Sequence, residues 1–174
     1  GGGRNKQLLM LADMPVLAHT LSAFSAAEEI FEIIVVARDQ DILLIQDLIK
    51  EFSIRKVKAV IPGGTSRQES VFQGLSEVTG ERVLIHDGAR PFITAEEIKA
   101  VLSSLDECRA AALGVAVRDT VKRIDGNQMV RETIPRENLV QVQTPQGFHT
   151  KEILAAHKKA AEEGIEVTDD CALA

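Results

Sequence analysis

The residues best suited to chemistry follow directly after a short apolar run. Residues 83–85 (Val-Leu-Ile) are typical of a buried strand, and residues 86–91 then read His-Asp-Gly-Ala-Arg-Pro. A carboxylate such as Asp87 at the end of a strand can hold Mg²⁺, which prefers oxygen ligands and substrate phosphates. Gly88 lets a ligand approach the backbone closely, and Arg90 offers a planar fork for phosphate. The structural alternative is an Asp–Arg ion pair that only closes a turn.

A second candidate loop follows the strand-like run 57–61. It reads Gly63-Gly64-Thr65-Ser66 and leads into a helix-like segment that contains Ser70. Backbone N–H groups at the start of a helix suit a polar or anionic ligand, and the hydroxyls add short polar partners. The structural alternative is a plain strand–helix turn, in which Ser66 caps the helix through a Ser-x-x-Glu pattern.

The N-terminus is a third candidate. Gly1, Gly2 and Gly3 precede Arg4 and Lys6. Glycines let backbone N–H groups surround phosphate, and a nearby cation adds charge. A flexible end explains terminal glycines equally well, so this loop alone is a weak indication of phosphate binding.

Cations and hydroxyls also gather in two further candidate loops late in the chain. Residues 118–123 read Arg-Asp-Thr-Val-Lys-Arg, and Arg136 is followed by Gln-Thr-Pro-Gln at residues 143–146. Such a concentration of cations in an acidic protein predicts an anion-binding surface. A solvated face of a hairpin is the structural alternative.

Composition excludes several classes of protein. The 174 residues carry 20 Lys and Arg against 26 Asp and Glu, a net charge of −6, which disfavours broad nucleic-acid binding. No apolar run approaches the roughly 18 residues of a membrane span, so no membrane partner is expected. Cys108 and Cys171 have no metal-binding spacing and form no disulfide framework, which predicts a reducing compartment, the cytoplasm by default. The four histidines are too scattered for a zinc site, and His86 suits a structural, hydrogen-bonded role.

The elements that must position these loops alternate along the chain. Strand-like runs at 33–36, 57–61, 83–85 and 110–117 are interleaved with segments of helical periodicity, one of which opens with a Thr94-x-x-Glu97 capping pattern. This order predicts one α/β domain over residues 1–174, with a doubly wound, Rossmann-like, mostly parallel sheet and helices on both faces. Ligands of such sheets bind beyond the carboxyl ends of the strands, where the first two loops are expected.

One stretch interrupts the alternation. Residues 120–124 and 129–134 flank Asp125-Gly126, a strong turn signal, so a protruding β-hairpin arm is predicted at about 118–137. The hairpin is polar at most positions and cannot be central in the sheet. It is either a surface flap or an arm that packs on a second subunit.

Taken in order, these motifs resemble one family. They are Lys6-Gln7, Pro15-Val16-Leu17, His19-Thr20-Leu21, Gly63-Gly64-x-x-Arg67, Ser70-Val71, residues 86–91, Asp119-Thr120-Val121-Lys122, Gln143-Thr144-Pro145-Gln146 and Thr168-Asp169-Asp170. The chain closely resembles the 2-C-methyl-D-erythritol 4-phosphate cytidylyltransferases of the non-mevalonate isoprenoid pathway, over nearly all its length. The resemblance implies transfer of CMP from CTP to methylerythritol phosphate with release of pyrophosphate, assisted by Mg²⁺.

The resemblance also implies roles for individual residues. Lys6 and Asp87 are the catalytic residues, and Asp87 is the metal ligand. The residues expected to bind CTP are Gly1, Gly2, Gly3, Lys6, Gly63, Gly64, Thr65, Ser70, Asp87 and Gly88. The residues expected to bind the sugar phosphate are Arg90, Thr120, Lys122, Arg136 and Thr144. The arm matches one by which two subunits embrace, so a homodimer is expected in which Thr120, Lys122 and Arg136 serve the neighbour's site.

Three other functions stay open at this point. Ribitol 5-phosphate cytidylyltransferases share the fold, although Lys122, Arg136 and Ser70-Val71 favour the methylerythritol enzyme. The family's first and last strands have no counterpart here, which implies that native N- and C-terminal segments are missing and leaves open a catalytically impaired nucleotide-binding module. A dehydrogenase lacks support, because no Gly-x-Gly-x-x-Gly follows a strand. The expected location is the cytoplasm, or the plastid for a plant protein.

Overall fold

The computed structural model describes residues 6–174, so Gly1, Gly2 and Gly3 of the predicted phosphate loop lie outside the described residues. Five α-helices are present in this part of the chain: α1 (Val16–Ala26), α2 (Ile42–Glu51), α3 (Arg67–Glu77), α4 (Ala95–Ser104) and α5 (Thr150–Glu163). The longer strands are β3 (Ile33–Ala37), β4 (Val57–Pro62), β5 (Arg82–Ile85), β6 (Ala110–Ala116), β7 (Val121–Ile124), β8 (Val130–Ile134) and β9 (Val140–His149). Short elements are η1 (Lys6–Leu8), β1 (Met10–Leu11), β2 (Met14–Pro15), η2 (Asp39–Asp41), η3 (Arg136–Asn138) and η4 (Asp170–Leu173). None of the helices within residues 6–174 has the length and apolar character needed to cross a membrane.

Strand pairing differs from the expected mostly parallel sheet. β3 and β4 are parallel, but β9 lies between β5 and β6 and runs antiparallel to both. The expected alternation is kept in one respect, since β5 and β6 must then run in the same direction. The difference arises from β9, whose residues 143–146 were expected to be a loop.

Local capping signals set the start of two helices as predicted. The Ser66 hydroxyl accepts a hydrogen bond from the backbone N–H of Glu69 (3.0 Å), at the start of α3. At α4, Thr94 Oγ1 accepts from the Glu97 N–H (3.2 Å) and Glu97 Oε2 accepts from the Thr94 N–H (2.9 Å), which completes a capping box. Such caps satisfy N–H groups that a helix cannot pair internally and contribute about 1 kcal/mol each.

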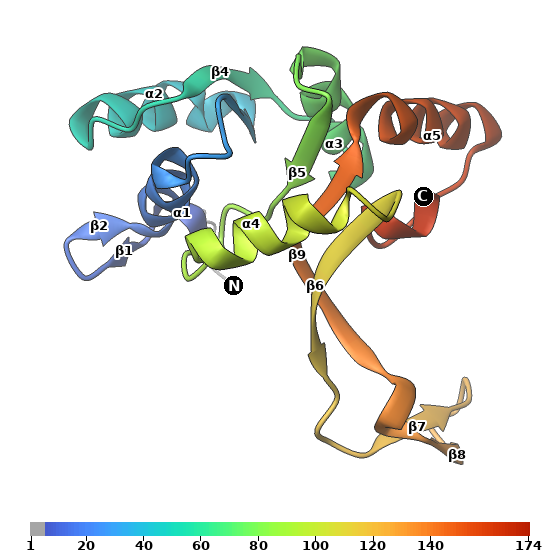
Figure 1. Cartoon of the computed structure of the whole chain (residues 1–174). Coiled ribbons are helices and arrows are strands. Elements are labelled where there is room, and N and C mark those ends of the chain that lie inside the picture. Colours follow the sequence, from blue (N-terminus) through green and yellow to red (C-terminus); the bar gives the residue numbers. More distant parts are fainter. Residues whose placement is uncertain (1–5) are drawn as a thin grey trace.

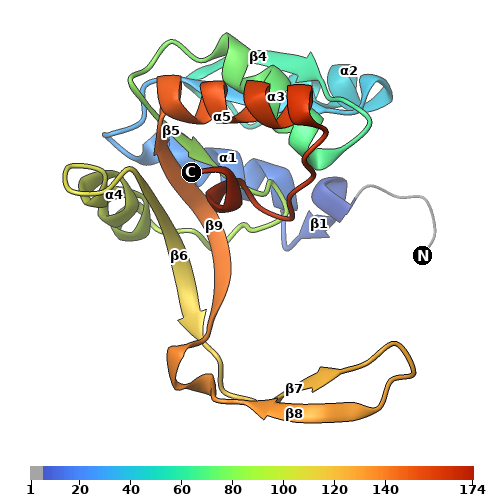
Figure 2. The ribbon, with the colours of Figure 1, turned by 90° about the vertical axis from the view of Figure 1, so that its right-hand side faces the viewer.

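Helices cover both faces of β5. Leu84 packs in a cluster with Phe24 of α1 and Ile98 of α4. Its neighbours Val83 and Ile85 pack instead in a cluster that includes α3 and α5. Successive side chains of a strand point to opposite faces, so α1 and α4 cover one face and α3 and α5 the other. Figures 1 and 2 show this layering around the strands.

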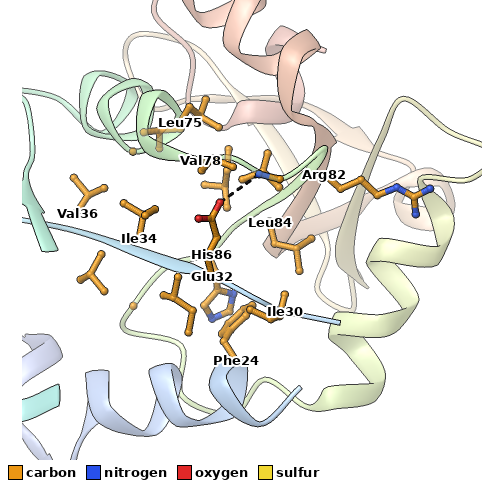
Figure 3. A pocket seen from close by; sticks show the side chains of 18 of the residues that line it. Phe24, Ile30, Glu32, Ile34, Val36, Leu75, Val78, Arg82, Leu84 and His86 are labelled. Atoms are coloured by element: carbon orange, nitrogen blue, oxygen red, sulfur yellow. Dashed lines mark hydrogen bonds between the residues drawn. The ribbon is translucent and has the colours of Figure 1, made fainter. Parts of the chain in front are cut away.

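An apolar cavity of about 970 Å³ separates β3 from β5. Ile34 and Val36 of β3 face Leu84 of β5 across it, as Figure 3 shows. At one edge Glu32 connects the two sides: its carboxylate accepts from the Thr79 N–H (2.6 Å) and pairs with Lys58 of β4 (3.0 Å). At the other edge the lining includes Asp87 and Gly88, which follow β5.

The predicted hairpin lies at the end of an extended stalk. The stalk is formed by residues 114–116 of β6 and 140–142 of β9, which pair antiparallel. Beyond it β7 pairs antiparallel with β8, and Figures 1 and 2 both show this hairpin projecting away from the helices. We call residues 118–137 the arm. Exposed apolar side chains lie on both arm and stalk: Val115, Ile124, Met129, Val130, Val140 and Val142.

Candidate functional site

Asp87 lies at the centre of a hydrogen-bonded loop after β5. Its backbone N–H donates to Thr144 Oγ1 (3.2 Å), and its carbonyl accepts from the Arg90 N–H (3.0 Å). The carboxylate is 40% exposed and accepts from Arg90 Nε at 3.0 Å through Oδ2. Arg67 Nε lies 3.9 Å from the other oxygen, Oδ1. The Asp–Arg pair of the structural alternative therefore exists, but it leaves the carboxylate accessible to a ligand.

His86 has the structural role that its position predicted. Its Nδ1 hydrogen-bonds with Thr144 Oγ1 (3.1 Å), and its Nε2 with the carbonyl of Arg90 (3.1 Å). The Phe24 ring packs against the imidazole, with the ring centroids 4.8 Å apart. Burial lowers the pKa of His86, although the hydrogen bond to Arg90 opposes the shift. The His86 imidazole, neutral at pH 7, thus fixes the loop by hydrogen-bonding to Thr144 of β9 through one nitrogen and to Arg90 through the other.

The glycine loop at the end of β4 is a tight turn. A Cβ on Gly64 would lie 2.2 Å from the Glu69 side chain, so no larger residue fits there without movement. The Gly64 N–H donates to Ser70 Oγ (3.0 Å), and both the N–H and the hydroxyl of Thr65 donate to Glu69 Oε2 (2.7 and 2.8 Å). These bonds hold the pKa of Glu69 below its ordinary value. The turn is therefore preformed around its own side chains, and its expected contact with CTP stays a prediction.

The first described residues lie beside the Asp87 loop. A Cβ on Gly88 would lie 3.0 Å from Leu17 and 3.6 Å from the Gln7 amide nitrogen, so Gly88 packs closely against η1 and α1. Thr20 of α1 fixes this contact by donating to the Gly88 carbonyl (3.0 Å). Lys6, adjacent to Gln7, is exposed. The predicted catalytic lysine and acid are thus carried by two segments in contact.

The residues expected to bind the sugar phosphate fall into two groups. Arg90 and Thr144 contact Asp87, as described above. Thr120 and Lys122 belong to the arm, and so does Arg136 in η3. Their contacts are local: Lys122 Nζ donates to Thr133 Oγ1 (2.6 Å), and Arg136 donates to the carbonyl of Arg118. One chain therefore does not bring the two groups together.

The donor set around Asp87 limits the kind of metal site that can form. Within residues 6–174, no group of three or more His, Cys, Asp or Glu side chains is close enough to hold an ion. Mg²⁺ does not need such a cage, because it is commonly held by one or two carboxylates together with substrate phosphates and water. Asp87 supplies one accessible carboxylate of this kind, and a phosphorylated ligand that brings Mg²⁺ would also offset the positive charge of Arg67 and Arg90 beside it.

A buried ionic network lies next to Asp87 and was not predicted from the sequence. Asp170 pairs with Arg67 Nη2 (2.8 Å) and with His157 Nε2 (3.0 Å), and the side chains of Asp170 and His157 are each 1% exposed. The backbone N–H of Asp170 donates to the buried Gln146 amide oxygen (3.0 Å). Burial opposes ionisation, but the hydrogen bond from His157 and the positive charge of Arg67 hold the pKa of Asp170 below its ordinary value. Arg67 and Asp170 both occur in the motifs above, yet their separation in sequence gives no sign of the contact.

Known proteins resemble this chain over almost all its length. A family profile described as 2-C-methyl-D-erythritol 4-phosphate cytidylyltransferase matches residues 1–174. Curated proteins of that name from Halalkalibacterium halodurans and Desulforamulus reducens are each 44% identical, over 98% and 97% of this chain and 75% and 73% of their own.

Solved structures agree. The 4-diphosphocytidyl-2C-methyl-D-erythritol synthase of Anaerococcus prevotii has a TM-score of 0.89 at 34% identity, covering 99% of this chain and 76% of that one. The 2-C-methyl-D-erythritol 4-phosphate cytidylyltransferase of Thermus thermophilus has a TM-score of 0.76 at 32% identity, covering 97% and 77%. With the loop of Asp87 and Arg90 held by Thr144 of β9, and a family match along the whole sequence, the chain belongs to the 2-C-methyl-D-erythritol 4-phosphate cytidylyltransferase family.

Proposed function

We propose that the protein transfers CMP from CTP to 2-C-methyl-D-erythritol 4-phosphate, releases pyrophosphate, and so supplies isoprenoid synthesis. The observation that carries this proposal is the family match along the whole chain, with Asp87 and Arg90 in one loop that Thr144 of β9 holds in place. The match does not favour the alternatives of a ribitol phosphate enzyme, an impaired nucleotide-binding module or a dehydrogenase.

The reaction needs positioning and charge stabilisation more than a protein nucleophile. A phosphate oxygen of the sugar phosphate attacks the α-phosphorus of CTP, the new P–O bond forms, and the bond to pyrophosphate breaks in line. Two anions must be held together while charge shifts toward the leaving pyrophosphate. The Lys6 ammonium would stabilise that charge, and Asp87 would hold Mg²⁺. When bound, the ion would neutralise phosphate charge.

The site divides into a nucleotide half and a sugar-phosphate half. The nucleotide half comprises Gly1, Gly2, Gly3, Lys6, Gly63, Gly64, Thr65, Ser70, Asp87 and Gly88. The sugar-phosphate half comprises Arg90 and Thr144, completed by Thr120, Lys122 and Arg136 from the arm of a second copy. The apolar residues exposed together on the projecting arm and stalk support this homodimer, because apolar side chains that gather on one surface mark an interaction site.

We further propose that a parallel strand fills the cavity between β3 and β5, which would make the sheet the expected doubly wound one. The facing edges of the two strands and the apolar lining support this, since unpaired strand edges accept a further strand. The occupant would be a segment preceding residue 1, because Gln7 lies beside Gly88 at the carboxyl end of β5.

The cytoplasm stays the proposed location, supported by two free cysteines.

Pyrophosphate release tests the main proposal. CTP, Mg²⁺ and methylerythritol phosphate should together give pyrophosphate and cytidine diphosphate methylerythritol, and omission of any one should abolish release. Ribitol 5-phosphate is the matched acceptor. A preference for ribitol phosphate would move the protein to the sister enzyme, and CTP binding without turnover would make it a nucleotide-binding module. Tight NADH binding without CTP binding would revive the dehydrogenase.

A further inference from the structure

We propose that Arg67 is a positioning residue for Asp87, and that the buried acid Asp170 holds Arg67 in place. The inference rests on the proposed function in so far as Asp87 acts in the transfer reaction. It concerns residues to which no catalytic or binding role was assigned above.

Asp170 is a fixed anchor. It is fully buried in η4, and three elements hold it: His157 of α5 and Arg67 of α3 pair with its carboxylate, while Gln146 of β9 accepts its N–H. A buried carboxylate with an ionic partner resists displacement, because removal of either partner leaves an uncompensated charge. The guanidinium that pairs with it therefore has little freedom at that end.

Arg67 spans the distance between this anchor and the site. Nη2 pairs with Asp170 at 2.8 Å, while Nε lies 3.9 Å from Asp87 Oδ1. The second distance is too long for a hydrogen bond, so the effect on Asp87 is electrostatic. Because Arg90 bonds to the other carboxylate oxygen at 3.0 Å, the Asp87 side chain lies between two cations. Arg90 belongs to the same loop as Asp87, whereas Arg67 is held by the buried Asp170.

Hydrogen bonds from the backbone N–H groups of Asp87 and Asp170 to β9 also hold this geometry. β9 holds both acids through side chains two residues apart: Thr144 accepts the N–H of Asp87 (3.2 Å), and Gln146 accepts that of Asp170 (3.0 Å). Arg67 thus connects the carboxylates of Asp87 and Asp170, two residues whose main chains are bonded to the same strand. A planar guanidinium with several N–H groups suits this connection, and a lysine ammonium could face only one carboxylate at a time.

The next residue provides a matched control. Gln68 holds the same C-terminal segment through other atoms: its amide donates to the Ile165 carbonyl (2.9 Å) and accepts from the Val167 N–H (3.1 Å). Gln68→Ala should therefore loosen the segment while leaving the Arg67–Asp170 pair in place.

The experiment compares Arg67→Met, Asp170→Asn, their double variant, Arg67→Lys and Gln68→Ala. Two readouts are used: kcat with saturating CTP, Mg²⁺ and methylerythritol phosphate, and hydrogen exchange of residues 86–91 in the ligand-free protein. Each of the first two variants should lower kcat about tenfold, and the double variant should lower it no further, because both changes remove one linkage. Both should speed exchange at residues 86–91 at least about threefold. Arg67→Lys should recover part of kcat, and Gln68→Ala should change neither readout more than about twofold.

Three results would overturn the proposal: additive losses in the double variant, equal losses in Gln68→Ala, or unchanged exchange in Arg67→Met. The Arg67 side chain is 41% exposed, so Arg67→Met remains informative even where Asp170→Asn fails to fold. If the wild-type protein released no pyrophosphate, the proposed function would fail, but the exchange measurement would still decide whether Arg67 fixes the Asp87 loop.

Discussion

The two groups of residues expected to bind the sugar phosphate differ in how they are held. Around Asp87, Thr144 is buried and fixes the loop through its hydroxyl. His86, directly after β5, hydrogen-bonds to Thr144 and to Arg90. On the arm, Lys122 and Arg136 are exposed and bond only to neighbouring parts of the arm. The body therefore presents a preformed surface. The arm presents cations that only the proposed homodimer would bring to the site of a second molecule.

Lys6→Ala should give the largest effect in the preformed half. An ammonium beside the α-phosphate would stabilise charge chiefly in the transition state, so kcat should fall by on the order of 10²–10³, the range for a single preorganised donor. Steady-state kinetics and direct CTP titration measure the change. CTP affinity should change much less. A loss confined to KM for CTP would mean that Lys6 binds ground state and transition state equally.

Arg136→Ala tests the arm half. Loss of a charge-assisted hydrogen bond of about 2–3 kcal/mol should raise KM for methylerythritol phosphate by roughly 10²-fold. Arg136→Lys should recover only part, because a point charge cannot replace a bidentate fork. Titration with CTP is the control and should show little change. Equal losses for both substrates would indicate that Arg136 supports the fold or the dimer, and the division of the site into two halves would be wrong.

The sequence predicted those parts of the molecule whose signals are local. The capping patterns at Ser66 and Thr94, the β-branched run at residues 33–36 and the turn at Asp125-Gly126 each specify structure within a few residues, and each occurs as expected. The structural, hydrogen-bonded role expected of His86 is also found.

Contacts between distant segments were not predictable in the same way. Residues 143–146 were predicted to be a loop, but they belong to β9, although Pro145 and Gly147 are of residue types depleted in strands. Packing between β5 and β6 overrides that local preference. Likewise Arg67 and Asp170 meet only because α3 and α5 pack side by side, and no spacing in the chain encodes that contact.

Val130→Asp tests whether the arm is covered by a second copy. Val130 is 59% exposed in the single chain, and burial of a charge in its place at an interface should weaken dimerisation about tenfold or more. Light scattering across a dilution series measures the dissociation constant. Leu44→Asp on α2, where the leucine is 54% exposed, is the matched control and should leave dimerisation unchanged. Dimerisation of Val130→Asp at wild-type affinity would remove this face of the arm from the interface.

Glu32→Gln should affect stability and not the site, because Glu32 lies at the edge of the cavity opposite Asp87. Burial opposes ionisation of Glu32, yet the Thr79 N–H and Lys58 lower its pKa to about 2 from an ordinary value of 4.5. A carboxyl whose pKa is depressed in the folded state adds stability that is present above pH 4.5 and is lost as pH falls toward 2. Glutamine cannot supply this contribution, so the variant should unfold more easily by about 2 kcal/mol at pH 7.

Urea unfolding of both proteins at pH 7, 5, 4 and 3 should show that difference narrowing below about pH 4.5. Lys58→Met is the control for the ion pair. It should cost less than Glu32→Gln, because the bonds from Thr79 to the Glu32 carboxylate persist. A difference between wild type and Glu32→Gln that stays constant down to pH 3 would show that the charge of Glu32 does not stabilise the fold. The connection across the cavity would then depend on the shape of the side chain alone.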